Sequence, residues 1–212
     1  MKHKRSIIKW LAALCLAAAG LSLAACGDEL VAVKYTDGKF VNARAGLSLL
    51  PAPVSYEPTH VGEAYAFYKK GNVTMYRIAD NDPALWLTQE YAGEMTTVFY
   101  SDTITLPTLA DFGADTIRIC EPSDVVMEVV RIGDAATVQA VTDLFLTAEE
   151  AELPSGDPTR TFDFKFSSPD WPQIYINLNY FEYGEDAYLY NRNTRRSVAL
   201  GDLLDGVLRD PG

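Results

Sequence analysis

Alternating apolar and polar residues dominate the chain after its first 30 positions and predict a strand-rich protein. The alternation is clearest over residues 162–166 and 174–181, where every second residue is Phe, Ile, Leu or Tyr. Further strands are predicted at 30–35, 39–44, 63–69, 73–78, 96–100, 103–106, 116–120, 125–132, 188–190 and 197–200.

Turn residues divide these segments into hairpins. Asp37-Gly38 lies between two alternating runs, which is a strong signal for a tight hairpin turn. Lys70-Gly71-Asn72 predicts a second hairpin in the same way. Three prolines between Pro51 and Pro58 predict a loop without regular structure.

One amphipathic helix is predicted at about 135–148, where apolar residues recur at helical spacing after Asp134. Short helices are predicted at 84–91 after Asp82-Pro83, at 107–112, and from Asp202. The predicted fold class is α+β with mainly antiparallel sheet. Two sub-domains are expected, residues 26–122 and 123–212, with a single core shared by both as the alternative.

The first 25 residues have the layout of an export signal. Lys2, Lys4 and Arg5 precede a run of small and apolar residues that ends in Leu23-Ala24-Ala25-Cys26. This ending resembles the lipobox of bacterial lipoproteins. The resemblance implies that residues 1–25 are removed and that Cys26 is lipidated, which holds the protein on the extracytoplasmic face of the cell membrane. The alternative is an ordinary secretory signal, which leaves Cys26 as a free thiol.

The mature region is strongly acidic. After removal of the signal, 14 basic residues stand against all 29 acidic ones. This balance excludes nucleic acid as a partner, because phosphates require clusters of Lys and Arg. It also argues against a domain that lies flat on anionic lipid. The membrane is therefore expected as a partner only through the lipid on Cys26.

Cysteine and histidine are too few for most metal sites. Only Cys120 and His60 remain in the mature region beside Cys26, so neither a zinc ligand set nor an internal disulfide is expected. Asp80-Asn81-Asp82 lacks the glycine and the distal glutamate of a calcium loop, and Asp82 is interpreted as a helix cap. Neither a metal nor a cofactor is predicted. Cys120 is interpreted as a structural strand residue.

A candidate binding face follows from the alternation itself. If the Phe and Ile residues of the last long strands face the core, their neighbours share the opposite face. Flat aromatic rings beside amides suit a sugar or a peptide strand. The alternatives are an ordinary sheet face and one covered by the N-terminal half. The predicted residues are Asp163, Lys165, Tyr175, Asn177, Asn179 and Phe181, with Trp171 on the loop at one end.

No catalytic signature accompanies this face. The chain has no Gly-x-Ser-x-Gly elbow, P-loop or dinucleotide glycine pattern. Arg192, Arg195 and Arg196 form a basic cluster, interpreted as a solvated turn or as a contact for an acidic partner. Three functions stay open: a non-enzymatic binding module for a protein, peptide or glycan, a carboxylate-dependent glycan hydrolase, and a ligand-binding component of a transporter.

Overall fold

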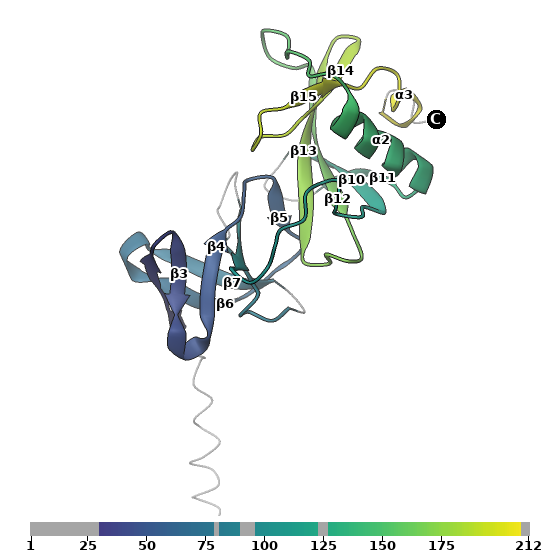
Figure 1. Ribbon diagram of the computed structural model, residues 1–212. Helices are drawn as coiled ribbons and strands as arrows, with labels where there is room; N and C mark the ends of the chain where they lie inside the picture. The colour runs from purple at the N-terminus through teal and green to yellow at the C-terminus, as the bar shows by residue number, and fades with distance from the viewer. Residues whose placement is uncertain (1–29, 79–80, 90–95, 123–126, 209–212) are drawn as a thin grey trace, which may run out of the picture. The chain divides into compact units, whose positions relative to one another are not determined.

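The computed structural model describes residues 30–78, 81–89, 96–122 and 127–208 (Figure 1). The predicted signal and Cys26 lie outside the described residues. Strands make up 47% of the chain and form two sheets. The α+β prediction is therefore wrong, and the fold is mostly β. Within the described ranges, one helix alone has seven or more residues.

The first sheet contains eight strands in the order β1-β6-β7-β8-β9-β4-β3-β2. All of its pairings are antiparallel except that of β1 with β6. The strands are β1 (Val31–Ala32), β2 (Lys34–Thr36), β3 (Lys39–Asn42), β4 (Leu47–Pro51), β6 (Val61–Tyr68), β7 (Val73–Ile78), β8 (Trp86–Gln89) and β9 (Thr97–Ser101). Short 3-10 turns, η1 (Ala43–Ala45) and η2 (Lys69–Gly71), connect β3 to β4 and β6 to β7.

This first sheet returns on itself as a nearly closed barrel. Its first and last strands, β1 and β2, are successive parts of one extended segment interrupted only at Val33. The Val33 amide donates to the Phe67 carbonyl at 3.0 Å, so the segment stays bound to β6 across the interruption. Eight buried apolar side chains fill the interior: Val33, Phe40, Leu47, Leu49, Ala66, Met75, Leu87 and Phe99.

The second sheet is an antiparallel array in the order β11-β10-β12-β13-β14-β15. A seventh strand, β5, pairs with residues 174–176 of β13, ahead of the part that pairs with β14. The strands are β5 (Tyr56–Pro58), β10 (Thr116–Glu121), β11 (Met127–Ile132), β12 (Arg160–Ser167), β13 (Ile174–Tyr183), β14 (Asp186–Tyr190) and β15 (Ser197–Ala199).

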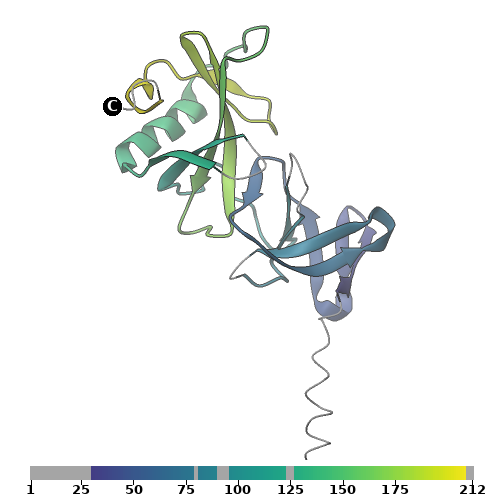
Figure 2. The same ribbon diagram turned by 180° about the vertical axis from the view of Figure 1, so that it is seen from behind.

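Helix α2 (Ala135–Thr147) covers one face of this second sheet (Figure 2). Asp134 caps it by accepting from the Thr137 amide at 2.9 Å, as the sequence predicts. Val138, Val141 and Phe145 enter a cluster of 23 buried apolar residues, together with the core side of β10, β12 and β13. The short helix α3 (Asp205–Leu208) adds Leu208. Among the described residues, no helix is long and apolar enough to cross a membrane.

Several local predictions are confirmed. Asp37 and Gly38 have φ of 51° and 79° and connect β2 to β3, as an Asp-Gly hairpin turn requires. The hairpin of β6 and β7 also forms, with Asn72 at φ 51°. Helix α2 lies where the apolar spacing places it.

Other local predictions are wrong. Of the helix predicted at 84–91, residues 84–85 form a turn and residues 86–89 form strand β8, in which Trp86, Leu87 and Thr88 are all buried. Asp82 does cap a turn there, but the turn leads directly into the strand. The proline-rich loop at 51–58 contains β5, and residues 103–112 form neither the predicted strand nor the predicted helix.

Candidate functional site

The side of the second sheet opposite α2 carries polar and charged residues in register. Arg118 on β10 lies opposite Lys165 on β12, which lies opposite Asn177 on β13. One step along, Cys120, Asp163 and Asn179 form the next row. We call this side the polar face; its members are Glu57, Arg118, Glu128, Asp163, Lys165, Tyr175, Asn177 and Asn179.

Glu57 on β5 joins the two central strands of the polar face. Its Oε2 accepts from Lys165 Nζ and its Oε1 accepts from Asn177 Nδ2, both at 2.6 Å. The other oxygen of that amide, Asn177 Oδ1, is buried without a hydrogen-bond partner among the described residues. In the adjacent row, Asn179 Nδ2 donates to Asp163 Oδ1 at 2.7 Å. The amides therefore orient the two carboxylates.

Burial and charge shift the pKa values of two members of the polar face. Burial raises the pKa of the Asp163 carboxyl, and the negative charge of Glu57 raises it further. Burial alone lowers the pKa of the Lys165 ammonium, but the charge and hydrogen bond of Glu57 outweigh it, and the pKa is raised. Lys165 therefore keeps its charge, while Asp163 is protonated more readily than an exposed aspartate.

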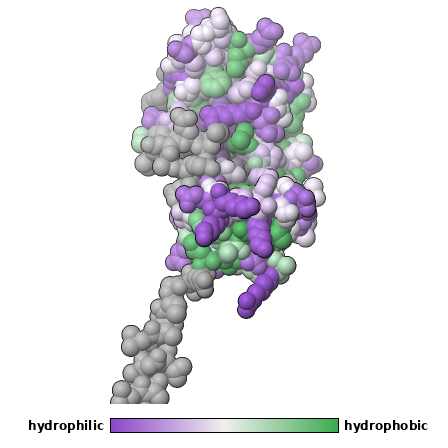
Figure 3. All heavy atoms as spheres, turned by 90° about the vertical axis from the view of Figure 1, so that its left-hand side faces the viewer, coloured by the Kyte–Doolittle hydropathy of each residue, from purple (hydrophilic) through white to green (hydrophobic). Residues whose placement is uncertain are grey.

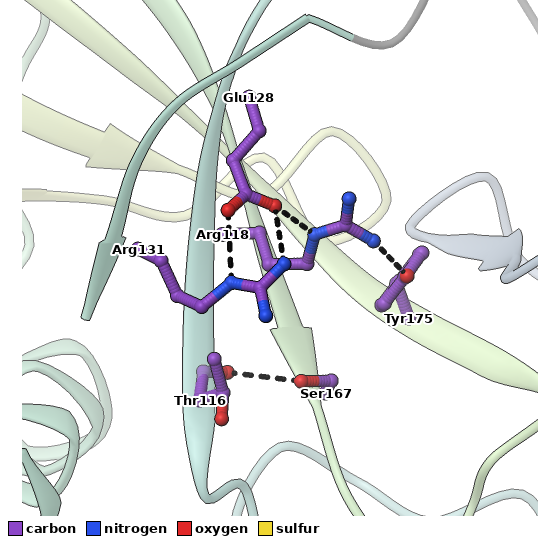
Figure 4. A network of polar contacts seen from close by, with 6 residues as sticks. All are labelled: Thr116, Arg118, Glu128, Arg131, Ser167 and Tyr175. Carbon is purple, nitrogen blue, oxygen red and sulfur yellow. Dashed lines mark hydrogen bonds and ion pairs between the residues drawn. The ribbon is translucent and has the colours of Figure 1, made fainter. Parts of the chain in front are cut away.

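A second ionic cluster lies at the β11 side of the polar face (Figure 4). Glu128 accepts from Arg131 Nε at 2.8 Å and also from Arg118 Nε. Arg118 donates in addition to the Tyr175 hydroxyl. The hydrogen bond from Arg131 lowers the pKa of Glu128 to about 2, with a further contribution from Arg118. Arg118 on β10 is therefore bound to β11 through Glu128 and to β13 through Tyr175.

Most of the predicted binding residues are covered rather than open to solvent. The exposed fractions of Lys165, Tyr175, Asn177 and Asn179 are all 8% or less. The polar face continues onto the β13–β14 hairpin, where it is more accessible. Four half-buried aromatic rings lie there on the same side of the sheet. We call them the aromatic strip: Phe181, Tyr183, Tyr188 and Tyr190. The rings of Phe181 and Tyr190 lie 5.9 Å apart, and those of Tyr183 and Tyr188 lie 6.0 Å apart.

Two predicted site elements lie elsewhere. Trp171 packs into the apolar cluster and meets Trp86 edge to face, with their ring centroids 6.3 Å apart. It is therefore not part of the polar face. In the predicted basic cluster, Arg196 donates to the carbonyls of Phe145 and Ala148 at the end of α2, so its role is structural.

The remaining candidate residues are placed as follows. Cys120 is buried on the polar side of β10, and this burial raises the pKa of its thiol. His60 is an exposed residue next to β6. No three His, Cys, Asp or Glu side chains within the described ranges converge as metal ligands do.

Comparison of the chain with models of protein families, with curated protein sequences and with solved structures gave no match. The function must therefore be inferred from the residues themselves. Sequence reasoning missed Glu57, Arg118 and Glu128 as members of the polar face. Alternation within β10 could have placed Arg118 opposite the core, but Glu57 precedes its partner Lys165 by 108 positions and carries no local signal.

Proposed function

We propose that this protein is a membrane-anchored extracytoplasmic lipoprotein that acts as a non-enzymatic module binding glycan through the aromatic strip. The lipobox-like sequence at Leu23–Cys26 supports the location. The observation that carries the binding role is the row of four half-buried rings on one side of the β13–β14 hairpin. Flat rings of this kind stack on the apolar faces of sugars.

The polar face supplies hydrogen-bonding groups next to these rings. Asn179 lies directly opposite Tyr190 across the β13–β14 pair, and its amide is held by Asp163. Asn179 itself is buried, but the half-buried Asp163 carboxylate that it holds can bind sugar hydroxyls without first losing conformational freedom. A peptide strand added beside the aromatic strip is less suitable, because β13 and β14 are internal and β15, the edge strand next to them, has only three residues.

Removal of rings from the aromatic strip tests the binding role. The mature protein is run through native gels that contain a soluble polysaccharide, one polysaccharide at a time, and its retardation is measured. Phe181→Ala and Tyr188→Ala should each weaken binding about twofold to tenfold, because each removes a stacking surface worth ~0.5–1.5 kcal/mol. Tyr76→Ala on β7 of the barrel removes a half-buried ring of the same kind, so it is the matched control and should leave retardation unchanged.

Three results would count against this proposal. Retardation that is equal in the wild type and both strip variants would contradict the site. Release of shorter sugars, lost in Asp163→Asn, would instead indicate a hydrolase that uses the raised pKa of that carboxyl. Binding only to peptides would contradict the ligand class.

The anchor is tested separately. The N-terminal peptide of the mature protein is weighed by mass spectrometry after membrane fractionation, in the wild type and in Cys26→Ala. A diacylglyceryl group on Cys26, with the variant unprocessed or released from the membrane, is the expected result. An unmodified Cys26 in a soluble product would contradict the anchor and leave a secreted binding module.

A further inference from the structure

The basic residues of the mature region are distributed unevenly. Four of its five lysines, Lys34, Lys39, Lys69 and Lys70, lie on the barrel. Residues 31–101 hold six basic and seven acidic residues, whereas residues 102–212 hold eight basic and 20 acidic ones. The large negative charge of the chain is therefore concentrated outside the barrel segment, and the net value conceals a local basic surface.

Strand pairing brings three of these lysines to one end of the barrel. Because β1 runs parallel to β6, with Val31 opposite Ala66, the segments that follow them reach the same end. Lys34 lies on β2, and Lys69 and Lys70 lie in η2. All three are exposed, and none forms an ion pair with another described residue. Lys39 differs, because Asp102 binds it at 2.7 Å.

Aromatic rings lie at the same end. Tyr35 is 50% exposed, and its ring centroid lies 4.8 Å from that of Phe40 and 6.2 Å from that of Tyr68. The Tyr68 ring lies over Gly71, where a Cβ atom would approach it to 2.8 Å. Figure 3 shows hydrophilic side chains projecting from the barrel beside hydrophobic surface. Tyrosine and lysine together are typical of surfaces that meet lipid headgroups.

We propose that this lysine end, defined by Lys34, Tyr35, Tyr68, Lys69 and Lys70, binds the anionic phospholipid headgroups of the membrane that holds the protein. The inference rests on the proposed anchor at Cys26. Lys34 follows that cysteine by eight residues, so the chain keeps it within about 28 Å of the lipid. Lysines near an anionic surface are attracted to it, and their stems tolerate the interface.

Asp37 is an opposing charge among the residues described at this end. It is exposed in the turn between β2 and β3 and reduces the net charge of the three free lysines from three to two. A net positive end that begins only eight residues after Cys26 still favours contact with an anionic surface. This proposal departs from the expectation drawn from net charge, because that expectation treats the acidic residues as if they were evenly spread.

Vesicle binding tests the lysine end without the anchor. The mature chain with Cys26→Ser is sedimented with phosphatidylcholine vesicles that contain or lack phosphatidylglycerol. Binding is expected only with phosphatidylglycerol, and it should weaken as salt screens the charges. Lys34→Gln/Lys69→Gln/Lys70→Gln should lower the partition coefficient on the order of tenfold to a hundredfold. Circular dichroism establishes that the triple variant is folded.

Arg192→Gln/Arg195→Gln is the matched control, because it removes two exposed positive charges from another part of the chain. It should retain vesicle binding within about twofold, since its charges lie outside the proposed surface. Equal loss in this control would overturn the assignment to the lysine end. Failure of the Cys26→Ser chain with all three lysines intact to bind anionic vesicles would overturn the proposal itself.

Two further outcomes separate this proposal from its alternatives. A soluble product with unmodified Cys26 that still binds anionic vesicles through the three lysines would overturn the anchor and support the lysine end. Lysine-dependent self-association in sedimentation velocity runs, without binding to vesicles, would assign the surface to the acidic part of a second copy. That result would overturn the membrane contact.

Discussion

The barrel and the second sheet bury the faces of their strands in different ways. The barrel closes on itself, so eight buried apolar residues fill its interior and no helix is needed. The second sheet is open and has two faces to cover. Helix α2 covers one and contributes to a cluster of 23 buried apolar residues, whereas one largely buried ion pair, Lys165 with Glu57, and buried amides occupy the other. The difference shows that an open sheet can bury one of its faces with charges, provided that they are paired.

The largest expected effect tests whether the two regions unfold together. Phe164 is fully buried and stacks on Tyr180 with the ring planes 3° apart. Phe164→Ala should cost about 3–5 kcal/mol through the cavity that it leaves. Because Ile78 and Trp86 of the barrel strands also belong to this cluster, urea unfolding should remain one transition by Trp fluorescence and by circular dichroism. Separate transitions for the two probes would show that the barrel folds independently.

An intermediate effect tests the charged face of the second sheet. Lys165→Met leaves Glu57 without its cation in a largely buried position, where the side chains are 11% and 21% exposed. The expected loss is about 2–3 kcal/mol in urea unfolding, somewhat less than for a fully buried pair. The matched pair on the barrel is Lys39 with Asp102, whose side chains are 38% and 26% exposed. Lys39→Ala should cost less than about 1 kcal/mol.

Equal losses in these two variants would contradict the contrast between a buried and an exposed ion pair. The double variant Glu57→Gln/Lys165→Met gives a further control. It removes both charges, so it should recover part of the stability lost in Lys165→Met. No recovery would show that packing of the lysine stem, rather than the unpaired charge, causes the loss.

The smallest expected effect concerns how the free energy of unfolding depends on pH. The pKa of Glu128 is about 2 in the folded protein against 4.5 for a free glutamate. A lowered folded pKa means that this group stabilises the fold above pH 4.5 and that the contribution is lost as pH falls towards 2. Glu128→Gln should therefore cost about 0.5–1 kcal/mol at pH 7, a figure reduced for solvent screening. The difference from wild type should shrink when urea unfolding is repeated at pH 3.

A pH-independent difference for Glu128→Gln would contradict the ionic origin of this contribution. Asp163 provides a contrast of opposite sign on the same face. Its folded pKa is raised by burial and by Glu57, so its ionisation opposes folding as pH rises above the usual aspartate range. The two acids therefore act against each other across the acidic range.

Local patterns predict the second sheet well and the barrel incompletely. The alternation over β12 and β13 identifies the core side, because every inward residue from Phe162 to Tyr180 is buried. The helix predicted at 84–91 fails because Asp82-Pro83 favours a turn whether a helix or a strand follows. A strand forms here because Trp86 and Leu87 are buried on opposite faces of the sheet. That burial depends on the whole sheet, so the local sequence does not reveal it.

Features that join distant segments escape prediction from the sequence. Barrel closure requires residues 31–36 to pair with both β3 and β6, and β5 reaches β13 across more than 100 residues. The candidate site, likewise, is only partly predictable from the sequence. Asp163, Lys165 and Asn179 follow from alternation, whereas Glu57 and the burial of the face do not.

The closing strand of the barrel would also bear mechanical load. With a lipid on Cys26, any pull between the membrane and the protein enters the fold at Val31, the first residue of β1. That segment is bonded to β6 on one side and, through β2, to β3 on the other. A pull along its length must shear both sets of hydrogen bonds together instead of breaking them one at a time. If Cys26 carries the lipid, the strand that closes the barrel would be the joint that bears this load.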